Sequence, residues 1–234
     1  MKQKNIFFNP KFWGTLTNPF YFARRSLSDG IKSVVNHASG RLLDIGCGSK
    51  PYKKYFNVDC YTGLEIDTSQ NLENSSFDYL YDGNKLPFDT NSYDTVFSSQ
   101  VLEHVFNPSV FISEIRRVSK PNSILILTVP FIWDEHEQPF DYGRYSSFGL
   151  RKFLQCHDFE IIVQKKLCSD FSCIIQIINV YFYKIILSKL KIPRKLHFIF
   201  YSTTNLIGLL LKSIIPKSDD MYIDNLVVAK NTKN

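Results

Sequence analysis

Residues 42–52 read LLDIGCGSKPY, and this stretch is the clearest indication of the fold in the sequence. An apolar run ends in the acid Asp44, and Gly46 and Gly48 then flank Cys47. Glycine adopts backbone dihedrals that other residues avoid, and it lets a ligand approach the main chain closely. A strand that enters such a turn and continues as a helix predicts a cofactor site at the edge of a parallel sheet.

On either side of this stretch, short apolar segments alternate with helical patterns. Segment 123–129, SILILTV, is almost entirely apolar, as expected for a strand in the middle of a parallel sheet covered on both faces. The alternation predicts an α/β fold: a doubly wound, Rossmann-like, mostly parallel seven-stranded sheet with its ligand at the carboxyl ends of the strands. The expected strands are residues 41–45, 61–66, 77–82, 93–99, 123–129, 159–167 and 223–230.

Three helices begin at recognisable capping signals. Asn18-Pro19 precedes apolar residues at helical spacing that continue towards Gly40, and Ser146 opens a helix through Cys156. Asn107-Pro108 is expected to cap a third helix. Its predicted inward face is Val110, Phe111, Ile115 and Val118.

We expect four segments along the chain. Residues 1–40 form an N-terminal helical segment, and residues 41–167 form the cofactor-binding core. Residues 168–222 are an apolar and basic helical insertion, and residues 223–234 are the last strand and a tail. The insertion holds two apolar stretches, 171–187 and 196–215, each interrupted by polar side chains. A transmembrane helix needs about 20 mostly apolar residues. We therefore predict a helical insertion, with a transmembrane hairpin as the alternative.

Charge is unevenly distributed over the 234 residues. The formal net charge is +6, and residues 151–234 hold 13 basic and 6 acidic side chains. A basic, apolar region suggests an anionic substrate or a membrane surface, although a solvated helix end would give the same pattern. The N-terminus lacks the apolar core of a secretory signal, and the five cysteines contain no CxxC pair. We expect a cytoplasmic chain with reduced thiols and peripheral contact at the inner membrane face through residues 168–222.

Two cofactor classes fit a glycine-rich turn. A dinucleotide fingerprint, G-x-G-x-x-G, fails here because Pro51 occupies its third glycine position. Asp44 would also repel a pyrophosphate, whereas it would attract a cation. The chain resembles the class I S-adenosylmethionine-dependent methyltransferases, in particular a type 11-like branch associated with cell-envelope and glycan modification. The resemblance rests on LLDIGCG, YTGLEID, FDYLYDGNKLPFDTNSYDTVFSSQVLEHV and RRVSKPNSILILTVP, in this order and spacing.

The resemblance implies roles for the residues at the ends of the strands. Asp44, Gly46, Cys47 and Gly48 would form the turn under the amino-acid part of S-adenosylmethionine, with Asp44 facing its ammonium group. Glu65 would accept both ribose hydroxyls, since a carboxylate accepts two donors at once, and Asp67 is its rival. The remaining cofactor contacts are expected from Asp82 and Gly83 at the adenine and from Ser99 and Gln100 at the methionine part. Ordinary capping of strand ends would also explain Asp44 and Asp82.

Two histidines are candidate general bases for a hydroxyl acceptor. His104 follows the fourth strand, in QVLEHV, and His136 lies in the long segment after the fifth. Some relatives carry E-x-x-E-H at this place and bind a divalent metal. This chain has Gln100 in place of the first glutamate, and an amide is a poor substitute for a carboxylate on a hard cation. We therefore expect no metal.

Residues 130–147, PFIWDEHEQPFDYGRYSS, form a long polar and aromatic segment after the fifth strand. It resembles the H-x-x-P-x-D-Y-x-R-Y-[ST] segment of the glycan-modifying branch. The resemblance implies that Asp141, Tyr142, Arg144 and Tyr145 shape the acceptor pocket, with Arg144 suited to an anionic group. The alternative is a rigid loop in which Arg144 pairs with Asp141.

These observations predict a methyltransferase that methylates an oxygen of a sugar or lipid-linked cell-envelope intermediate. Two alternatives remain open: a methyltransferase for a small diffusible metabolite such as a quinone precursor, and a catalytically silent cofactor-binding subunit. Nucleic acid is not an expected partner, because SSQV follows the fourth strand where a nucleic-acid methyltransferase would carry an N/D-P-P-Y-type motif.

Overall fold

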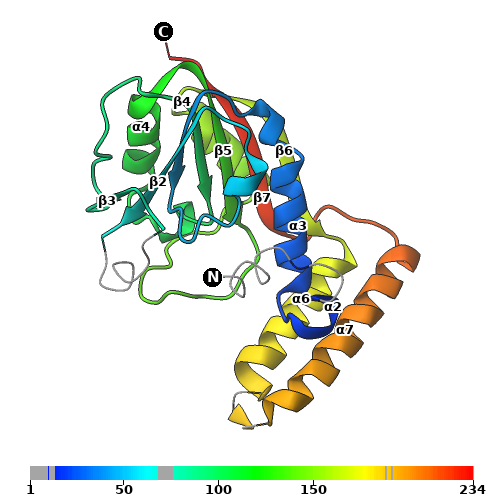
Figure 1. Ribbon diagram of the computed structural model, residues 1–234. Helices are drawn as coiled ribbons and strands as arrows, with labels where there is room; N and C mark the ends of the chain where they lie inside the picture. The colour runs from blue at the N-terminus through cyan, green and yellow to red at the C-terminus, as the bar shows by residue number, and fades with distance from the viewer. Residues whose placement is uncertain (1–9, 11–13, 68–75, 188, 191, 234) are drawn as a thin grey trace. The chain divides into compact units, whose positions relative to one another are not determined.

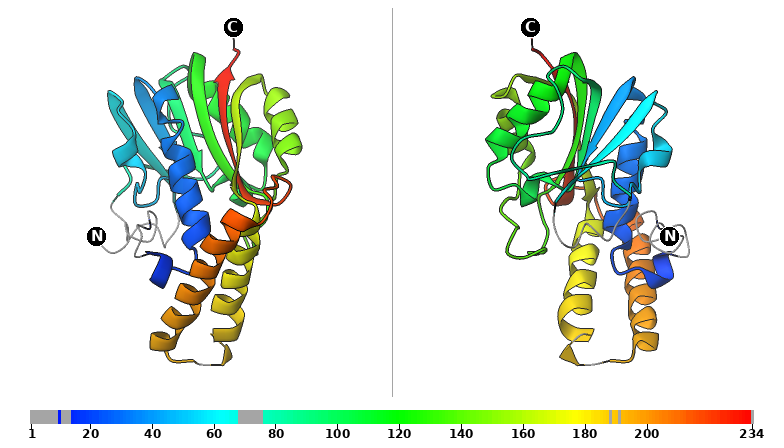
Figure 2. Two further views of the ribbon diagram at one scale, coloured as in Figure 1. Left: turned by 90° about the vertical axis from the view of Figure 1, so that its right-hand side faces the viewer. Right: turned by 60° about the vertical axis from the view of Figure 1, so that its left-hand side comes forward.

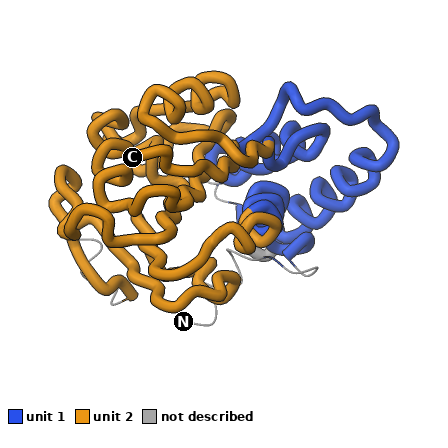
Figure 3. Tube along the Cα trace, turned by 90° about the horizontal axis from the view of Figure 1, so that it is seen from above, with its two compact units in different colours: residues 1–30, 166–224 blue, residues 31–165, 225–234 orange. Residues whose placement is uncertain are grey.

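The computed structural model describes residue 10 and residues 14–67, 76–187, 189–190 and 192–233. The chain divides into two compact units, shown in different colours in Figure 3. One consists of residues 1–30 and 166–224, and the other of residues 31–165 and 225–234. Residues 1–30 of the predicted N-terminal segment and the insertion thus belong to the same unit, whereas residues 31–40 belong to the other.

A seven-stranded sheet forms the centre of the larger unit (Figure 1). Its strand order is β3-β2-β1-β4-β5-β7-β6, and the pairs β1–β2, β1–β4, β2–β3 and β4–β5 are parallel. The predicted doubly wound α/β fold is confirmed. The strands are β1 (Arg41–Ile45), β2 (Cys60–Ile66), β3 (Tyr79–Tyr81), β4 (Tyr93–Ser99), β5 (Ser119–Pro130), β6 (Phe159–Ser169) and β7 (Tyr222–Asn231).

The order of the strands indicates where a ligand binds. β1 and β4 are neighbours although two strands separate them in the chain, so the connections reverse direction between them. A ligand of an open α/β sheet binds at such a switch point, beyond the carboxyl ends of the strands. Gly46 follows β1 directly, and Gln100 follows β4 directly. Both residues therefore lie where a ligand is expected.

Helices α4 (Pro108–Val118) and α5 (Ser147–Gln155) contribute to the main hydrophobic core. The Ser146 hydroxyl accepts the N–H of Gly149 and caps α5, as predicted. The interpretation of α4 was partly wrong: Asn107 makes no capping bond, and Val110 is exposed, whereas Ile112 is buried in the core. Val110 instead lines the pocket described below, which explains an apolar residue on that face.

Several predicted boundaries also differ from the structure. The third strand is short, because only Tyr79–Tyr81 pair with β2. The N-terminal helix, α3, covers Tyr21–Lys32 and is followed by the 3₁₀ turn η1 (Val35–His37) rather than continuing to Gly40. Two further 3₁₀ turns, η2 (Lys53–Tyr55) and η3 (Leu102–His104), follow β1 and β4. All five cysteines are free, and Cys60 and Cys156 are exposed.

The smaller unit is helical. It contains α2 (Gly14–Thr17), α6 (Phe171–Tyr181) with its π-helical continuation η4 (Phe182–Leu187), α7 (Arg194–Ile214) and most of α3. Helices α6 and α7 run side by side as an antiparallel pair (Figures 1 and 2). Gly208 permits close packing within the unit, because a Cβ there would lie 2.9 Å from Phe22 and 3.0 Å from Ile175.

Polar side chains lie between the helices of this unit. The Asn179 amide donates to Asn205 Oδ1 at 2.8 Å, and Asn205 donates to the carbonyl of Thr15 at 2.8 Å. Gln176 accepts the N–H of Ala23 and donates to the carbonyl of Pro19. These amides are fully buried, and their hydrogen bonds offset the cost of removing them from water. Over the described residues, no helix combines the length and hydropathy needed to cross a bilayer.

Candidate active site

A pocket of about 630 Å³ opens at the carboxyl ends of β1, β2 and β4. This volume is within the range of cofactor sites. Five of the nine predicted cofactor residues line it: Gly46, Gly48, Glu65, Gly83 and Gln100. The sheet thus brings together residues that are up to 54 positions apart in the chain.

Glycine is needed at positions 46 and 48, after β1, for two different structural reasons. Gly46 has a φ of +69°, and a Cβ there would lie 2.3 Å from Val101 Cγ2. Gly48 has a φ of +49°, but its missing Cβ would meet no atom within 4 Å. Gly46 is therefore required by the protein's own packing, whereas Gly48 leaves open space on the pocket wall for a ligand.

Glu65 at the end of β2 holds the glycine turn in place. Its Oε2 accepts the N–H of Gly48 at 2.7 Å, and its Oε1 accepts the N–H of Ile66 at 3.1 Å. The carboxylate lines the pocket. Each oxygen can accept a second donor, so the ribose role is compatible with these contacts. Asp67, the rival, is exposed, and its backbone N–H binds the Tyr81 carbonyl.

Asp44 is buried at the end of β1 and accepts the Tyr61 hydroxyl at 2.5 Å. Burial raises the pKa of Asp44 to about 7, against the opposing hydrogen bond from Tyr61. The carboxyl therefore changes its charge near neutral pH. It is not among the described residues that line the pocket. Its neighbour Cys47 is also buried, and burial raises the pKa of that thiol, so Cys47 is not a thiolate nucleophile at neutral pH.

The remaining predicted cofactor residues lie at the ends of β3 and β4. The exposed Asp82 carboxylate accepts the backbone N–H groups of Asn84 and Lys85, which is the local capping considered from the sequence. Ser99 exchanges a hydrogen bond of 2.8 Å with Thr128, and the Gln100 amide donates to the same hydroxyl at 3.3 Å. Asn84, a neighbour of Asp82, lines the pocket and was missed from the sequence.

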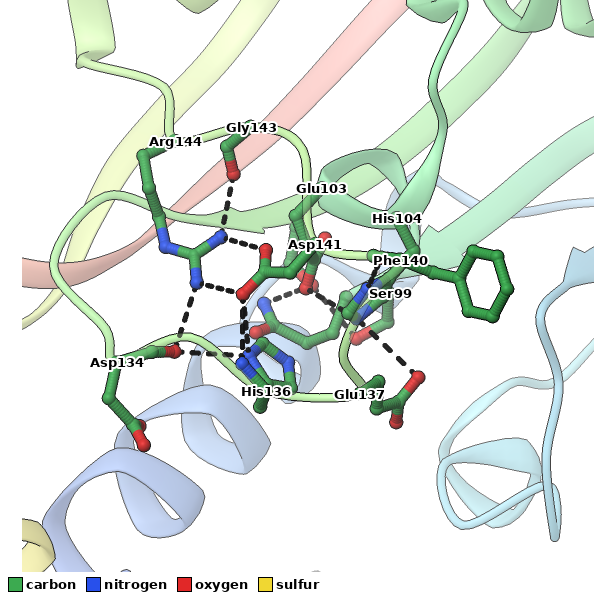
Figure 4. Close-up of polar contacts among 12 residues, drawn as sticks. Ser99, Glu103, His104, Asp134, His136, Glu137, Phe140, Asp141, Gly143 and Arg144 are labelled. Atoms are coloured by element: carbon green, nitrogen blue, oxygen red, sulfur yellow. Dashed lines mark hydrogen bonds and ion pairs between the residues drawn. The ribbon is translucent and has the colours of Figure 1, made fainter.

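The two candidate bases meet beside the pocket (Figure 4). The rings of His104 and His136 lie edge to face, with 4.8 Å between their centroids. His104 lines the pocket, and its Nδ1 lies 2.7 Å from the Phe140 carbonyl. His136 Nδ1 lies 3.2 Å from the Asp134 carbonyl and 3.3 Å from Asp141 Oδ2. In both rings Nδ1 is engaged, so Nε2 is the nitrogen left to exchange a proton with an acceptor.

Asp141 and Arg144 bind each other in the loop of residues 130–147, beside His136. Arg144 donates to both carboxylate oxygens of Asp141, at 2.5 and 2.6 Å. Although burial opposes it, the Arg144 hydrogen bond lowers the pKa of Asp141 to about 2. The rigid-loop alternative thus describes the pairing seen here. Tyr142 and Tyr145 lie in the same loop, and the exposed Tyr142 ring packs edge to face on Phe106 at 5.2 Å.

Backbone hydrogen bonds join this loop to the turn that carries His104. The carbonyl of Glu103 accepts the N–H groups of Tyr142 and Gly143, at 2.8 and 3.1 Å. Glu103, His104 and His136 offer ligand atoms within 4.8 Å of one another, which is close enough to hold a metal ion. The sequence placed Glu103 and His104 together but gave no indication that His136 joins them. The expectation that no metal is used stays a prediction.

Besides Asn84, sequence reasoning missed two further features of the site. Glu137 lines the pocket, and its Oε2 lies 3.7 Å from Nε2 of His104. Phe106 and Val110 supply exposed apolar surface at the same pocket. The pair Asn107-Pro108, which lies between these two residues, was interpreted only as a helix start. In the sequence, the available signal was a phenylalanine, Phe106, directly before the predicted helix start at Asn107-Pro108.

Comparisons with known proteins agree with this architecture. Residues 43–127 match a family model described as a methyltransferase domain. The crystal structure of the [4+2]-cyclase SpnF is 19% identical, with 91% of this chain and 83% of that chain covered and a TM-score of 0.57. A SAM-dependent methyltransferase from Thermotoga maritima is 14% identical over 94% and 93% of the two chains, with a TM-score of 0.57.

A third similar structure contains the cofactor. Haemonchus contortus phosphoethanolamine N-methyltransferase 2, in complex with S-adenosyl-L-methionine, is 18% identical over 84% of this chain and 49% of that chain, with a TM-score of 0.51. At these identities the structural likeness shows the fold alone. The family match covers the glycine turn, Glu65, Gln100 and His104. Residues 43–127 are thus similar to a methyltransferase domain, and they include strands β2, β3 and β4 of the doubly wound sheet.

Proposed function

We propose that the chain is an S-adenosylmethionine-dependent methyltransferase that acts on a hydroxyl oxygen of a sugar or lipid-linked intermediate of the cell envelope. The observation that carries the proposal is the His136 imidazole, bound by Asp141 and placed against His104 at the wall of the cofactor pocket. A hydroxyl acceptor must lose a proton during methyl transfer, and a positioned base typically contributes about 10²–10⁴-fold to the rate.

The proposed reaction is an in-line displacement. The acceptor oxygen forms a bond to the methyl carbon while the bond from that carbon to the sulfonium sulfur breaks, and S-adenosylhomocysteine leaves. The acceptor's proton passes to Nε2 of His136. Since the donor is already activated, holding donor and acceptor in line is the protein's main contribution. His104 is the alternative base, because it lines the pocket itself.

The cofactor-binding residues are part of the proposal. Gly46 and Gly48 would leave room for the amino-acid part, Glu65 would bind the ribose, and Gly83 and Gln100 would line the adenine and methionine parts. Asp44 would act from beneath the turn through its charge. A thermal-unfolding scan with S-adenosylmethionine, S-adenosylhomocysteine or NAD tests this. A ligand at 100 times its dissociation constant stabilises by about 2.7 kcal/mol, which raises Tm by several degrees. A shift with NAD alone would contradict the assignment.

Two features support an envelope acceptor. The loop of residues 130–147 has the composition of the glycan-modifying branch, and its exposed Phe140 and Tyr142 offer aromatic surface for a sugar ring. The basic, apolar residues 168–222 suit work at the inner face of a membrane. We therefore place the protein in the cytoplasm, peripheral to that membrane.

Transfer of a radiolabelled methyl group identifies the acceptor. Purified protein and labelled S-adenosylmethionine are incubated with an envelope lipid and glycan extract, or with the soluble metabolite fraction of the same cells. We expect label in the envelope extract, stable to mild base, as an ether is. His136→Ala should abolish this label but leave the cofactor-induced rise in Tm unchanged. Label confined to soluble metabolites would overturn the envelope assignment.

A further inference from the structure

Helices α6 and α7 bury amide side chains beside the apolar Ile175, Val180 and Tyr201, and they expose a further set of large apolar side chains. Their amide side chains, Gln176, Asn179 and Asn205, are fully buried and bind one another or the neighbouring backbone. We name the exposed set the outer stripe: Ile174, Ile178 and Tyr181 on α6, and Leu196, Ile199, Leu206, Leu210 and Ile214 on α7.

The outer stripe follows helical spacing, so it forms a continuous face on each helix. On α6 its members are separated by four and three residues, and on α7 by three or four residues when the exposed Thr203 is included. Leu210 and Ile214 are 66% and 76% exposed. A soluble protein normally buries such a stripe and exposes its amides. Large exposed apolar faces mark sites that contact a membrane or another protein.

Charge selects between these two kinds of partner. No Asp or Glu occurs between Asp170 and Asp219, whereas Lys or Arg occurs seven times in the same stretch. Four of these basic residues, Lys184, Lys189, Lys212 and Lys217, are exposed among the described residues. Exposed apolar side chains beside basic residues without acids complement an anionic lipid surface.

The hydrogen-bonded amides explain how the pair keeps this arrangement. Thr204 donates to Asn179 Oδ1 at 2.6 Å, and Asn179 in turn donates to Asn205. Because the polar groups are satisfied internally, the outer stripe can leave water without exposing unpaired donors to lipid. Asp170 and Ser218 close the base of the pair through two hydrogen bonds. The pair is thus a closed element that presents apolar and basic surface.

We propose that the outer stripe and the exposed lysines beside it dock this protein onto an anionic lipid bilayer, with α6 and α7 lying in the interface. Over the described residues no helix is suited to span a membrane, and an interfacial helix buries its apolar face only about 5–10 Å deep. This inference deepens the proposed function, because a lipid-linked acceptor would lie at the same surface. The arrangement of α6 and α7 carries it independently of the acceptor.

Sedimentation of the full chain with lipid vesicles tests the docking surface. The vesicles are phosphatidylcholine alone, or phosphatidylcholine with phosphatidylglycerol. We expect the wild-type protein to sediment with the anionic vesicles and several-fold less with the neutral ones. Lys189→Glu should weaken anionic binding by at least about fivefold, since each basic residue near the surface contributes about that factor. Equal binding of the wild-type protein and Lys189→Glu to anionic vesicles would contradict the proposed role of the exposed lysines.

A second variant tests the apolar face. Leu206→Glu/Leu210→Glu should abolish sedimentation, whereas Phe148→Glu should bind as wild type does. Phe148 is the matched control because it is 81% exposed and lies on α5 in the other unit. All three residues are exposed, so the variants should keep the wild-type circular dichroism and the cofactor-induced rise in Tm. Unchanged sedimentation of the double variant would overturn the proposal.

The same variants distinguish a lipid surface from a second copy of the chain. Light scattering measures the molar mass of each protein in solution. A dimeric wild-type protein, a monomeric double variant and no vesicle binding would together overturn the proposal in favour of a dimer. Vesicle binding by a protein that labels only soluble acceptors would support the docking surface and overturn the proposed acceptor. Label in the envelope extract without vesicle binding would support the proposed acceptor and overturn the docking surface.

Discussion

Asp141 binds His136 at two points. Its Oδ2 accepts the backbone N–H of His136 at 3.0 Å and lies 3.3 Å from Nδ1 of the ring. Arg144 binds the same carboxylate from the other side and keeps it ionised. Asp141 thereby fixes both the main chain and the ring of the proposed base. Its part in the site is that of a positioning residue, with no need for contact with the acceptor.

Asp141→Asn should therefore lower kcat by about 10–100-fold, because the ring loses its ionised partner but the loop retains a hydrogen-bond acceptor. Initial rates with labelled S-adenosylmethionine and the envelope extract measure this, and isothermal titration measures the cofactor Kd, which should stay unchanged. Glu135→Gln is the matched control, since Glu135 is an exposed acid of the same loop. A kcat equal to that of the control would remove Asp141 from the mechanism.

Replacing Glu65 tests the ribose contact. Glu65→Ala should weaken binding of S-adenosylhomocysteine by at least about tenfold, since a charge-assisted hydrogen bond typically contributes about 1.5–3 kcal/mol. Isothermal titration measures the affinity, and Asp67→Ala is the control on the same strand end. If only Asp67→Ala weakens binding, the ribose contact belongs to Asp67.

Cofactor affinity should depend on pH through Asp44. The folded-state pKa is raised to about 7 by burial, with Tyr61, Glu65 and Lys50 also acting on it. Below pH 7 the carboxyl is neutral and attracts the ammonium group of the cofactor less. We expect affinity to fall between pH 8 and pH 6. In Asp44→Asn the affinity should be weaker at pH 8 and nearly independent of pH. An equal pH dependence in both proteins would assign it to another group.

The sign of the Asp44 effect on stability follows from the same shift. The folded pKa lies above the unfolded value of 3.8, so the folded state binds the proton more tightly. Stability without cofactor should therefore decrease as the pH rises from about 4 to about 7. Urea unfolding at pH 5 and pH 7.5 measures this, and Asp44→Asn should lose most of the difference.

Removal of divalent metals should leave activity unchanged. Glu103, His104 and His136 are close enough to hold an ion, but Gln100 takes the place of a carboxylate ligand, and the proposed mechanism needs the imidazoles free. Dialysis against EDTA, with metal content measured before and after, should not alter kcat/KM. A loss of activity that Mn²⁺ or Zn²⁺ restores would show that these residues bind a metal.

Asn205→Ala should destabilise the helical unit by about 1–3 kcal/mol. The substitution removes the bonds to Thr15 and Asn179 and leaves a buried Asn179 donor without its acceptor. Urea unfolding followed by circular dichroism measures the change in free energy of unfolding. Ser213→Ala, on the exposed side of α7, is the control and should lie within about 0.5 kcal/mol of wild type.

Much of the fold was readable from local patterns. Strands β1 and β4 have the predicted bounds, because each holds a short apolar stretch, Leu42-Leu43 or Val96-Phe97, that suits a strand buried on both faces. Val110 was misassigned because helical periodicity locates an apolar face without saying what covers it. Val110 lines the pocket and does not pack against the sheet.

Local sequence patterns were sufficient to predict the doubly wound sheet, the glycine turn at the end of β1 and the two candidate bases as separate residues. Each depends on short-range chemistry, namely strand hydrophobicity, glycine dihedrals and the types of side chain that exchange protons. The tertiary structure is needed to see that His136 meets His104, that Asp141 contacts His136, and that the amides of α6 and α7 are buried while many of the leucines and isoleucines of these helices are exposed. These relationships join residues that are distant in the chain or depend on which helix face is covered, so no local pattern encodes them.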